Sequence, residues 1–227
     1  MKKIILSVAV AIGIASGVFA QKQTAEQIVE KYISICADKG YLDTLRTMRF
    51  TAMLIVGDQN IPVNTVKESG RFLFTYAKTD SGMQGQLYLD GKGYNIVNGK
   101  KQEITSPAEL DDLLLQTHML PDVMYKPLGY KMTLQKSRKE DGVQYDVVRI
   151  ESPHGNVRTN FYERETGLLR IVETSDRTKV YLTEYMKHKG GLYNKNNIIK
   201  GPNGMSMELT LLAIYNNEKI DPELMKF

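Results

Sequence analysis

The histidines and one glycine-rich loop are the first places where this sequence could carry chemistry. His118, His154 and His188 lie far apart, and none belongs to an HExxH pattern or lies near a cysteine pair, so their spacing does not indicate a zinc site. No Gly-x-Ser-x-Gly segment supplies a nucleophile elbow. The glycine-rich segment 201–206 lacks the lysine of a phosphate-binding loop. These residues therefore predict neither a metal site nor a phosphate site.

Two pairs of acidic residues are the next candidates. Asp111-Asp112 falls in a helical pattern and Glu140-Asp141 falls at a turn, and adjacent carboxylates in such places are ordinarily solvent-exposed charges. The sequence also shows no candidate nucleophile beside a base. We therefore interpret the chain as a non-enzymatic protein without a metal or a cofactor.

Cys36 is the single cysteine, so the domain has no internal disulfide and its stability must come from packing. It follows Ile28, Tyr32 and Ile35 at helical spacing, which predicts a small buried hydrophobe. A reactive thiol would need cationic neighbours or a helix start, and the sequence indicates neither.

The longest regular pattern in the chain is an alternation over residues 205–217. Successive side chains of a strand point to opposite faces, so one face of this predicted strand is apolar and the other begins polar. The apolar face comprises Met205, Met207, Leu209, Leu211, Ala213 and Tyr215, and the polar one Ser206, Glu208 and Thr210. From Leu211 onward, Leu212 and Ile214 make the second face apolar too, which indicates a sheet that is covered at one end. The apolar face is either an ordinary core or the wall of a cavity for an apolar ligand.

Composition indicates a soluble globular protein. The chain has 227 residues, of which 42% are hydrophobic and 25% are charged. Eleven methionines and thirteen tyrosines, with no tryptophan, would suit a deformable wall, because the unbranched methionine side chain adapts to variable shapes. A core that uses methionine as filler would have the same composition.

The first twenty residues have the pattern of a cleavable secretory signal. Lys2 and Lys3 precede an apolar run from Ile4 to Phe19, and Ala20 provides the small residue expected before cleavage. The run is shorter than the roughly 20 apolar residues that span a bilayer. We therefore expect residues 1–20 to be removed and residues 21–227 to form one domain in the periplasm. Loss of the two lysines from a net charge of +4 leaves +2, which disfavours a nucleic-acid partner.

The mature chain is predicted to open with a helix and to continue as a meander of strands. Thr24 and Gln27 form a capping box, and Gly40 supplies a left-handed stop. About ten short strands follow, separated by tight turns and without strand-helix alternation, although residues 187–200 read mainly as a connection. The fold class is therefore α+β, an antiparallel sheet with two or three helices on one face.

One helix interrupts the strands. Ser106, Pro107 and Glu109 form its start, and leucines follow at helical spacing. The irregular segment 119–130 after it is rich in apolar side chains, which is typical of a lid or gate over a cavity. A loop folded over the open end of an ordinary core would give the same pattern.

Several segments resemble the outer-membrane lipoprotein-sorting family, the LolA and LolB superfamily and especially its bacteroidete-type members. They are the opening helix 25–32, the segment 45–50, the strand and turn 87–94, the hairpin 140–147, and the end of the chain from Glu184-Tyr185 through Ile214-Tyr215-Asn216-Asn217 to the tail 220–227. The resemblance covers nearly all of the mature chain and rests on structural motifs. The sequence departs from LolB in lacking a lipid-anchoring cysteine after the signal segment.

The resemblance implies an unclosed, strongly curved half-barrel around helices, with an apolar hollow for lipoprotein acyl chains. It also implies an arginine that holds the lid, and Arg49 is nearest in position. The expected wall residues are Phe50, Leu54, Phe72, Phe74, Leu87, Leu89, Met205, Met207, Leu209 and Leu211, and the expected lid residues are Leu113, Leu114, Met119 and Met124.

The function expected on these grounds is that of a monomeric, non-enzymatic carrier. It would shield acyl chains of lipoproteins or lipids during transfer toward the outer membrane, and its partners would be those ligands and membrane sorting components. The alternative is a periplasmic sensor or interaction module on the same fold, which binds a protein partner or free lipid.

Overall fold

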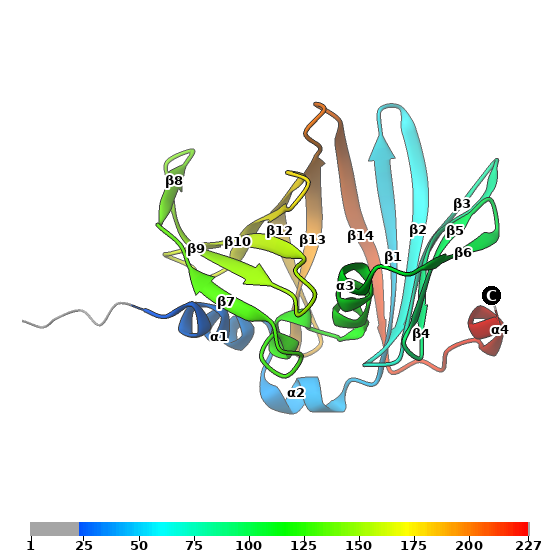
Figure 1. The fold of residues 1–227 in the computed structure, drawn as a ribbon, viewed down its shortest axis with the longest axis horizontal. Helices are drawn as coiled ribbons and strands as arrows, with labels where there is room; N and C mark the ends of the chain where they lie inside the picture. The colour runs from blue at the N-terminus through cyan, green and yellow to red at the C-terminus, as the bar shows by residue number, and fades with distance from the viewer. Residues whose placement is uncertain (1–22, 227) are drawn as a thin grey trace, which may run out of the picture.

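The computed structural model describes residues 23–226, which form one antiparallel sheet of 14 strands with four α-helices and a short 3-10 helix (Figure 1). The predicted signal segment 1–20 lies outside the described residues. The predicted fold class, an unclosed curved antiparallel sheet with helices, is confirmed. No helix within residues 23–226 combines the length and the apolar character needed to span a membrane.

The strands and helices have the following bounds. The strands are β1 Thr47–Val56, β2 Gln59–Glu68, β3 Phe72–Thr79, β4 Gly82–Leu89, β5 Lys92–Val97, β6 Lys100–Ile104, β7 Lys131–Leu134, β8 Arg138–Glu140, β9 Val143–Glu151, β10 Val157–Glu163, β11 Leu169–Thr174, β12 Lys179–His188, β13 Gly191–Lys200 and β14 Ser206–Asn216. The helices are α1 Ala25–Cys36, α2 Lys39–Thr44, α3 Pro107–Thr117, the 3-10 helix η1 Pro121–Met124, and α4 Pro222–Lys226.

Two meanders meet in the middle of the sheet. The strand order is β6-β5-β4-β3-β2-β1-β14-β13-β12-β11-β10-β9-β7, with β8 paired to β9. Within each meander most neighbours in sequence are also neighbours in space. The turns Asn98-Gly99 and Asp141-Gly142 have positive φ at both positions, as a two-residue hairpin turn between twisted strands requires. The meanders join where β1 pairs with β14, and a bulge in this pair leaves Leu212 as an extra residue that is 60% exposed.

Both predicted helix starts are present. Thr24 and Gln27 exchange the two hydrogen bonds of a capping box, at 3.3 and 2.9 Å. At α3 the Ser106 hydroxyl accepts a hydrogen bond from the backbone N–H of Glu109 at 3.4 Å, and Pro107 occupies the first turn. These caps satisfy backbone donors that a helix leaves free at its N-terminus.

Helices α1 and α3 lie on the same face of the sheet, in the hollow formed by its curvature (Figure 1). The largest cluster of buried residues joins α1, α3 and the segment after it to β9, β10 and β11; it contains Ala25, Ile28, Val29, Tyr32, Cys36, Leu115, Tyr125, Tyr130, Val148, Ile150, Tyr162 and Leu169. A second cluster joins Leu113 of α3 to Leu73, Tyr88 and Ile104. Helix α3 therefore contributes to the cores of both meanders.

The opposite face of β2–β5 carries another apolar cluster, which the C-terminal segment covers. Val66, Phe72, Phe74, Leu87 and Ile96 are each at most 4% exposed, and Ile220, Leu224 and Met225 pack against them. The segment is also tied to β1: the Thr47 hydroxyl donates to the Glu218 carbonyl at 2.6 Å, and Arg49 pairs with the Glu218 carboxylate at 2.7 Å.

Three local predictions differ from the structure. Gly40 does not end α1, because Ala37 already leaves the helix to form a β-bridge to β13, and Gly40 lies inside α2. Segment 187–200 is not a connection: most of it forms β13, which pairs with β12 on one side and β14 on the other. The sequence predicts a single strand over residues 131–139, but the structure divides this segment between β7 and β8. The described residues therefore form 14 strands where about ten were predicted.

Candidate functional site

An aliphatic stripe crosses the hollow face of the sheet beyond the reach of α1 and α3. It comprises Leu54, Ile61, Val63, Val180, Ile199, Met207 and Leu209, which the strand register places on one side of β2, β1, β14, β13 and β12. All seven side chains are half-buried, and none belongs to the five clusters of buried residues in the described chain. In Figure 1 the ends of β13, β14, β1 and β2 extend well past α3. The stripe is therefore apolar surface that no helix covers.

The structure divides the predicted wall between two faces. Leu54, Met207 and Leu209 belong to the stripe; Phe50 and Leu211 lie on the same face, beside the buried cluster of Leu45, Met48 and Ile214. Phe72, Phe74, Leu87 and Leu89 lie on the opposite face, where the C-terminal segment packs over them. Met205 precedes β14 in the turn and is 45% exposed. The predicted wall residues therefore do not form one surface, because both faces of β3 and β4 are apolar and the chain fills both, with α3 on one side and the C-terminal segment on the other.

The predicted lid residues also take part in the core. Leu113 is 2% exposed and packs with Leu73, Tyr88 and Ile104, and Leu114 lies half-buried beside them. Met119 packs near Phe50 and Tyr193, and Met124 packs on the cluster around α1. Segment 119–130 contains Tyr125 and Tyr130, which are 3% and 7% exposed. These residues hold α3 in the hollow, next to the stripe.

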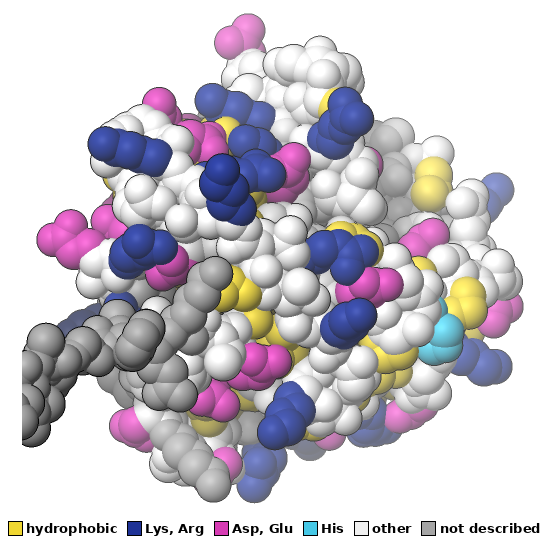
Figure 2. All heavy atoms as spheres, turned by 60° about the vertical axis from the view of Figure 1, so that its left-hand side comes forward, with side chains coloured by type: hydrophobic (Ala, Val, Ile, Leu, Met, Phe, Trp, Pro, Cys, Tyr) yellow, Lys and Arg dark blue, Asp and Glu magenta, His cyan; other side chains and the backbone are white. Residues whose placement is uncertain are grey.

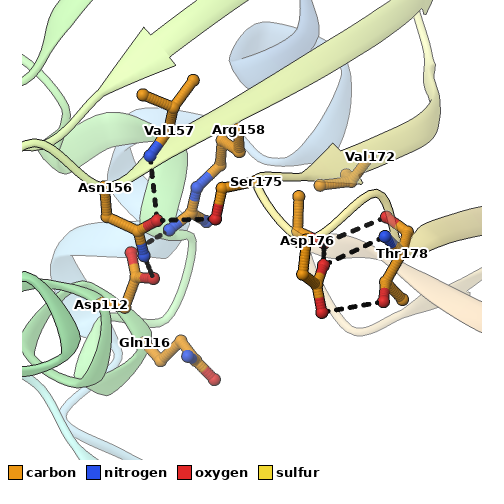
Figure 3. A pocket seen from close by; sticks show the side chains of 10 residues that line it. Asp112, Gln116, Asn156, Val157, Arg158, Val172, Ser175, Asp176 and Thr178 are labelled. Atoms are coloured by element: carbon orange, nitrogen blue, oxygen red, sulfur yellow. Dashed lines mark hydrogen bonds and ion pairs between the residues drawn. The ribbon is translucent and has the colours of Figure 1, made fainter. Parts of the chain in front are cut away.

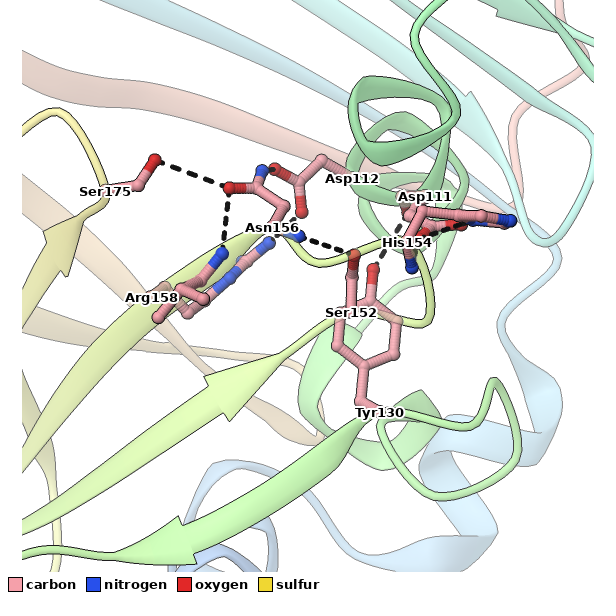
Figure 4. Close-up of polar contacts among 9 residues, drawn as sticks. Asp111, Asp112, Tyr130, Ser152, His154, Asn156, Arg158 and Ser175 are labelled. Carbon is pink, nitrogen blue, oxygen red and sulfur yellow. Dashed lines mark hydrogen bonds and ion pairs between the residues drawn. The ribbon is translucent and has the colours of Figure 1, made fainter.

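Hydrogen bonds and ion pairs fasten the middle of α3 to the β9–β10 hairpin (Figure 4). Asp112 pairs with the Arg158 guanidinium and accepts a hydrogen bond from the Asn156 amide. Asp111 accepts from the backbone N–H of His154 at 3.0 Å and contacts its Nδ1 at 3.0 Å. Burial raises the pKa of Asp112 above its ordinary value, and the Arg158 charge offsets part of this rise. The Asp111-Asp112 pair was interpreted as solvent-exposed, but the two side chains are only 15% and 25% exposed.

The C-terminal end of α3 is fastened to the other meander. Lys67 of β2 donates from Nζ to the His118 carbonyl at 2.6 Å and to the Gln116 carbonyl at 3.4 Å. The backbone N–H of Gly70 donates to the Thr117 hydroxyl at 3.0 Å. Burial lowers the pKa of Lys67 to about 7, while its position at the carbonyl end of a helix favours the cation. Helix α3 is thus a cross-brace between the two meanders.

Arg49 does not hold α3. It lies on the outer face of β1, where its guanidinium stacks 3.8 Å from the centroid of the Tyr215 ring and pairs with Glu218. The arginine that contacts the helix is Arg158, which comes from the other meander. The order of residues along the chain could not identify it, because Arg158 and Asp112 are brought together only by the tertiary fold.

A pocket of about 460 Å³ opens between α3 and the β11–β12 turn (Figure 3). Asp112 and Gln116 line it from α3, Arg158 from β10, and Ser175, Asp176 and Thr178 from the turn. Its apolar floor includes Val172, which is the register partner of Val180 in the stripe. The pocket therefore adjoins one end of the stripe and provides polar groups there. We call it the α3 pocket.

Cys36 and the histidines do not gather into a reactive centre. Cys36 is 3% exposed, and burial raises its pKa to about 12, so its thiol stays protonated at neutral pH. His118 caps α3 and its Nδ1 lies 2.9 Å from the Ser69 hydroxyl. Among residues 23–226, no group of three or more histidine, cysteine or acidic side chains is placed to hold a metal ion.

Asp122, in η1, is the most strongly buried carboxylate of the segment after α3. It is 9% exposed, and its Oδ1 has no hydrogen-bond partner among the described residues. Burial raises its pKa from the ordinary 3.8 to about 6, partly offset by a hydrogen bond from Tyr125. The native protein therefore keeps this group neutral in a range where the unfolded chain ionises it.

Replacing Asp122 with asparagine is expected to stabilise the protein at high pH. The folded-state pKa lies above the unfolded one, so stability from this group is present below pH 3.8 and is lost as the pH rises through about 6. At about 1.4 kcal/mol per pKa unit, Asp122→Asn should gain about 3 kcal/mol at pH 8 and almost nothing at pH 4. Urea unfolding at both pH values measures the difference. An equal gain at both would indicate a packing effect instead.

Comparison with solved structures identifies the class of fold. It is similar to a DUF1329 family protein from Desulfovibrio piger (10% identity, TM-score 0.58, covering 88% of this chain and 95% of that one). It is also similar to a LolA superfamily protein from Nitrosomonas europaea (10% identity, TM-score 0.56, covering 89% of this chain and 97% of that one). A third similar structure is a putative outer-membrane lipoprotein-sorting protein domain from Vibrio parahaemolyticus (11% identity, TM-score 0.58, covering 88% of this chain and 96% of that one). No protein-family model and no curated protein sequence matches.

The chain therefore has the fold of LolA superfamily structures. The resemblance found in the sequence is confirmed at the level of the fold, over nearly nine-tenths of the chain. At identities of 10–11% this likeness concerns the path of the chain and not the ligand.

Proposed function

We propose that this protein is a periplasmic, non-enzymatic carrier that shields acyl chains of lipoproteins or lipids on the aliphatic stripe. The observation that carries the proposal is the stripe itself: seven half-buried aliphatic side chains on the face of the sheet that helices cover elsewhere. On the face turned toward the viewer in Figure 2, acidic and basic side chains are interspersed, with small groups of hydrophobic side chains between them. Exposed apolar surface of this kind is typical of binding sites.

The dimensions and energetics of the stripe support an acyl chain as ligand. It crosses five strands spaced about 4.8 Å apart, a span of about 19 Å. Each methylene group moved out of water contributes about 0.8 kcal/mol. Partial burial of one or two chains along the stripe would therefore hold an acylated molecule in transit, while leaving it able to move to a site that buries more of it.

The sequence also supports the proposed carrier role. A signal segment at residues 1–20, cleaved after Ala20, would deliver the protein to the periplasm as a monomer. There it would receive and pass on lipoprotein acyl chains or lipids between membrane sorting components. Helix α3 would have to move for more of the hollow to become available, because its leucines now occupy it.

Leu209→Asp is expected to remove acyl-chain binding with little effect on the fold, because Leu209 is half-buried and lies at the centre of the stripe. Thr210→Asp places the same charge one residue further, on the outer face, and is the matched control. We expect native mass spectrometry of wild-type protein and control, purified from the periplasm, to detect bound acylated molecules. Binding by the Leu209 variant should fall at least tenfold.

The same measurement separates the carrier from the alternative. A wild-type protein that is an empty monomer and binds no acylated probe would contradict the carrier role and favour the sensor or interaction module. Retention of ligand by Leu209→Asp would place the binding surface elsewhere on the molecule.

A further inference from the structure

The α3 pocket is polar where the adjoining stripe is apolar. Val172 on its floor faces Val180 of the stripe across the β11–β12 pair, so a chain lying on the stripe has its end at the pocket. The rim presents the Gln116 amide and the hydroxyls of Ser175 and Thr178. A molecule with one apolar and one hydrogen-bonding part would place each part on matching surface.

The charges at the pocket do not sum to zero. Among the described residues that line it, Arg158 is the one cation, and Asp112 neutralises it (Figure 3). Asp176 has no cationic partner among them. Its carboxylate accepts hydrogen bonds from the Thr174 hydroxyl at 2.5 Å, the Thr178 N–H at 3.0 Å and the Thr178 hydroxyl at 3.1 Å. These neutral donors hold the pKa of Asp176 below its ordinary value, so the group stays ionised.

The Arg158 guanidinium is not available to an incoming anion without cost. Its partner Asp112 also accepts the Asn156 amide, and Asn156 Oδ1 in turn accepts from the Val157 N–H at 2.9 Å and from the Ser175 hydroxyl at 3.5 Å. An anion that took Arg158 would leave the three-quarters-buried Asp112 carboxylate without its counter-ion. Among the side chains that line the pocket, the Asp176 carboxylate is therefore the one charge left without a counter-ion, beside neutral hydrogen-bonding groups.

We infer that the α3 pocket is a head-group subsite that selects amphiphiles whose polar end carries no net negative charge. This inference rests on the proposed acyl-chain binding and adds its selectivity. A ligand amide N–H can donate to the hydroxyl oxygens of Ser175 and Thr178, whose hydrogens already bond to Asn156 and Asp176. An amide or ester carbonyl can accept from the Gln116 amide, and an ammonium group is attracted by Asp176. A phosphate or carboxylate end meets Asp176 at the rim and is disfavoured.

The test uses three N-palmitoyl amino-acid amides that share one acyl chain: those of glycine, lysine and glutamate. A pair of unit charges about 4 Å apart in water changes an equilibrium about fivefold. We therefore expect wild-type protein to bind the glutamate probe about fivefold more weakly than the glycine probe, and the lysine probe at least as well as the glycine probe. Isothermal titration below the micellar concentration of each probe gives the three dissociation constants.

A charge series at the rim makes the test specific. Asp176→Asn keeps an oxygen acceptor for Thr178, and should abolish the discrimination. Gln116→Lys should reverse it, and Gln116→Glu, its matched control at the same exposed position of α3, should increase it. If all three probes bind equally to wild-type protein, or if Gln116→Lys and Gln116→Glu show the same preference among the probes, the head-group subsite is refuted and the carrier role stands. If no probe binds at all, both fail.

Discussion

Replacing Arg158 with methionine is expected to destabilise the protein by about 2–3 kcal/mol at neutral pH. Removing one partner of a fully buried ion pair costs about 3–5 kcal/mol, and a smaller loss is expected here because the two side chains are 22% and 25% exposed. Asp112 would keep Asn156 as its partner but lose the charge that offsets its burial. For a chain of this size the melting temperature should fall by about 5–10 °C.

The stability lost in Arg158→Met should depend on pH, because protonation of Asp112 removes the uncompensated charge. Its folded-state pKa is already above the ordinary value and rises further without Arg158. Stability is then lost as the pH rises through that pKa, so Arg158→Met should be closer to wild type at pH 4 than at pH 8. Amide hydrogen exchange should quicken in α3 before it quickens in β9 or β10, since the pair fastens the helix to that meander.

A double-mutant cycle shows whether this loss of stability comes from the ion pair. Asp112→Leu combined with Arg158→Met replaces the pair with apolar groups and should recover most of the stability lost in the single Arg158 variant. If the two single losses simply add, the side chains act independently, and the brace depends on the backbone contacts of α3 instead.

Deleting residues 218–227 is expected to lower the free energy of unfolding more than any single substitution described above. Ile220, Leu224 and Met225 cover Phe72, Phe74 and Leu87, which are all 0% exposed in the intact structure. At about 1–1.5 kcal/mol for each of the three half-buried covering side chains, the loss is about 3–4.5 kcal/mol. The uncovered aromatic face should also bind the dye ANS and promote aggregation.

A point variant separates the covering effect from loss of the segment as a whole. Leu224→Asp should reproduce about half of the loss and part of the dye binding. Lys219→Ala, in the same segment but exposed, should change neither. A shortened protein that melts at the wild-type temperature and binds no dye would mean that this face is stable when exposed, and it would restore Phe72 and Phe74 as candidate ligand contacts.

The alternation of apolar residues predicted which residues share a face but not which face lines the hollow. Leu54, Met207 and Leu209 were assigned together and do lie together, because the register of β1 and β14 follows the pattern of period two. In β3 and β4 both faces are apolar, so periodicity alone could not show whether Phe72 and Phe74 or Leu73 faces the hollow. Which side receives a helix depends on where α3 and the C-terminal segment pack, and α4 is too short to give a clear amphipathic signal.

The brace across α3 was missed for a different reason. Asp112, Asn156 and Arg158 look like solvated polar residues in their local sequence, and only the packing of α3 against β10 partly buries them. Lys67 likewise reads as the exposed end of a strand, yet it is 6% exposed beneath the last turn of α3. An adjacent pair of acidic residues in an otherwise leucine-rich helix was the one available signal.

The pairing of β1 with β14 affects how the chain folds. All other neighbours in the sheet can form hairpins or short-range pairs soon after they emerge, but the first strand must wait for the last one. Until then, β1 and β13 are open edges that could capture the strands of other molecules. The sheet can thus be completed only by a chain that extends through β14, so a polypeptide that ends before Asn216 would depend on an escort to stay out of aggregates.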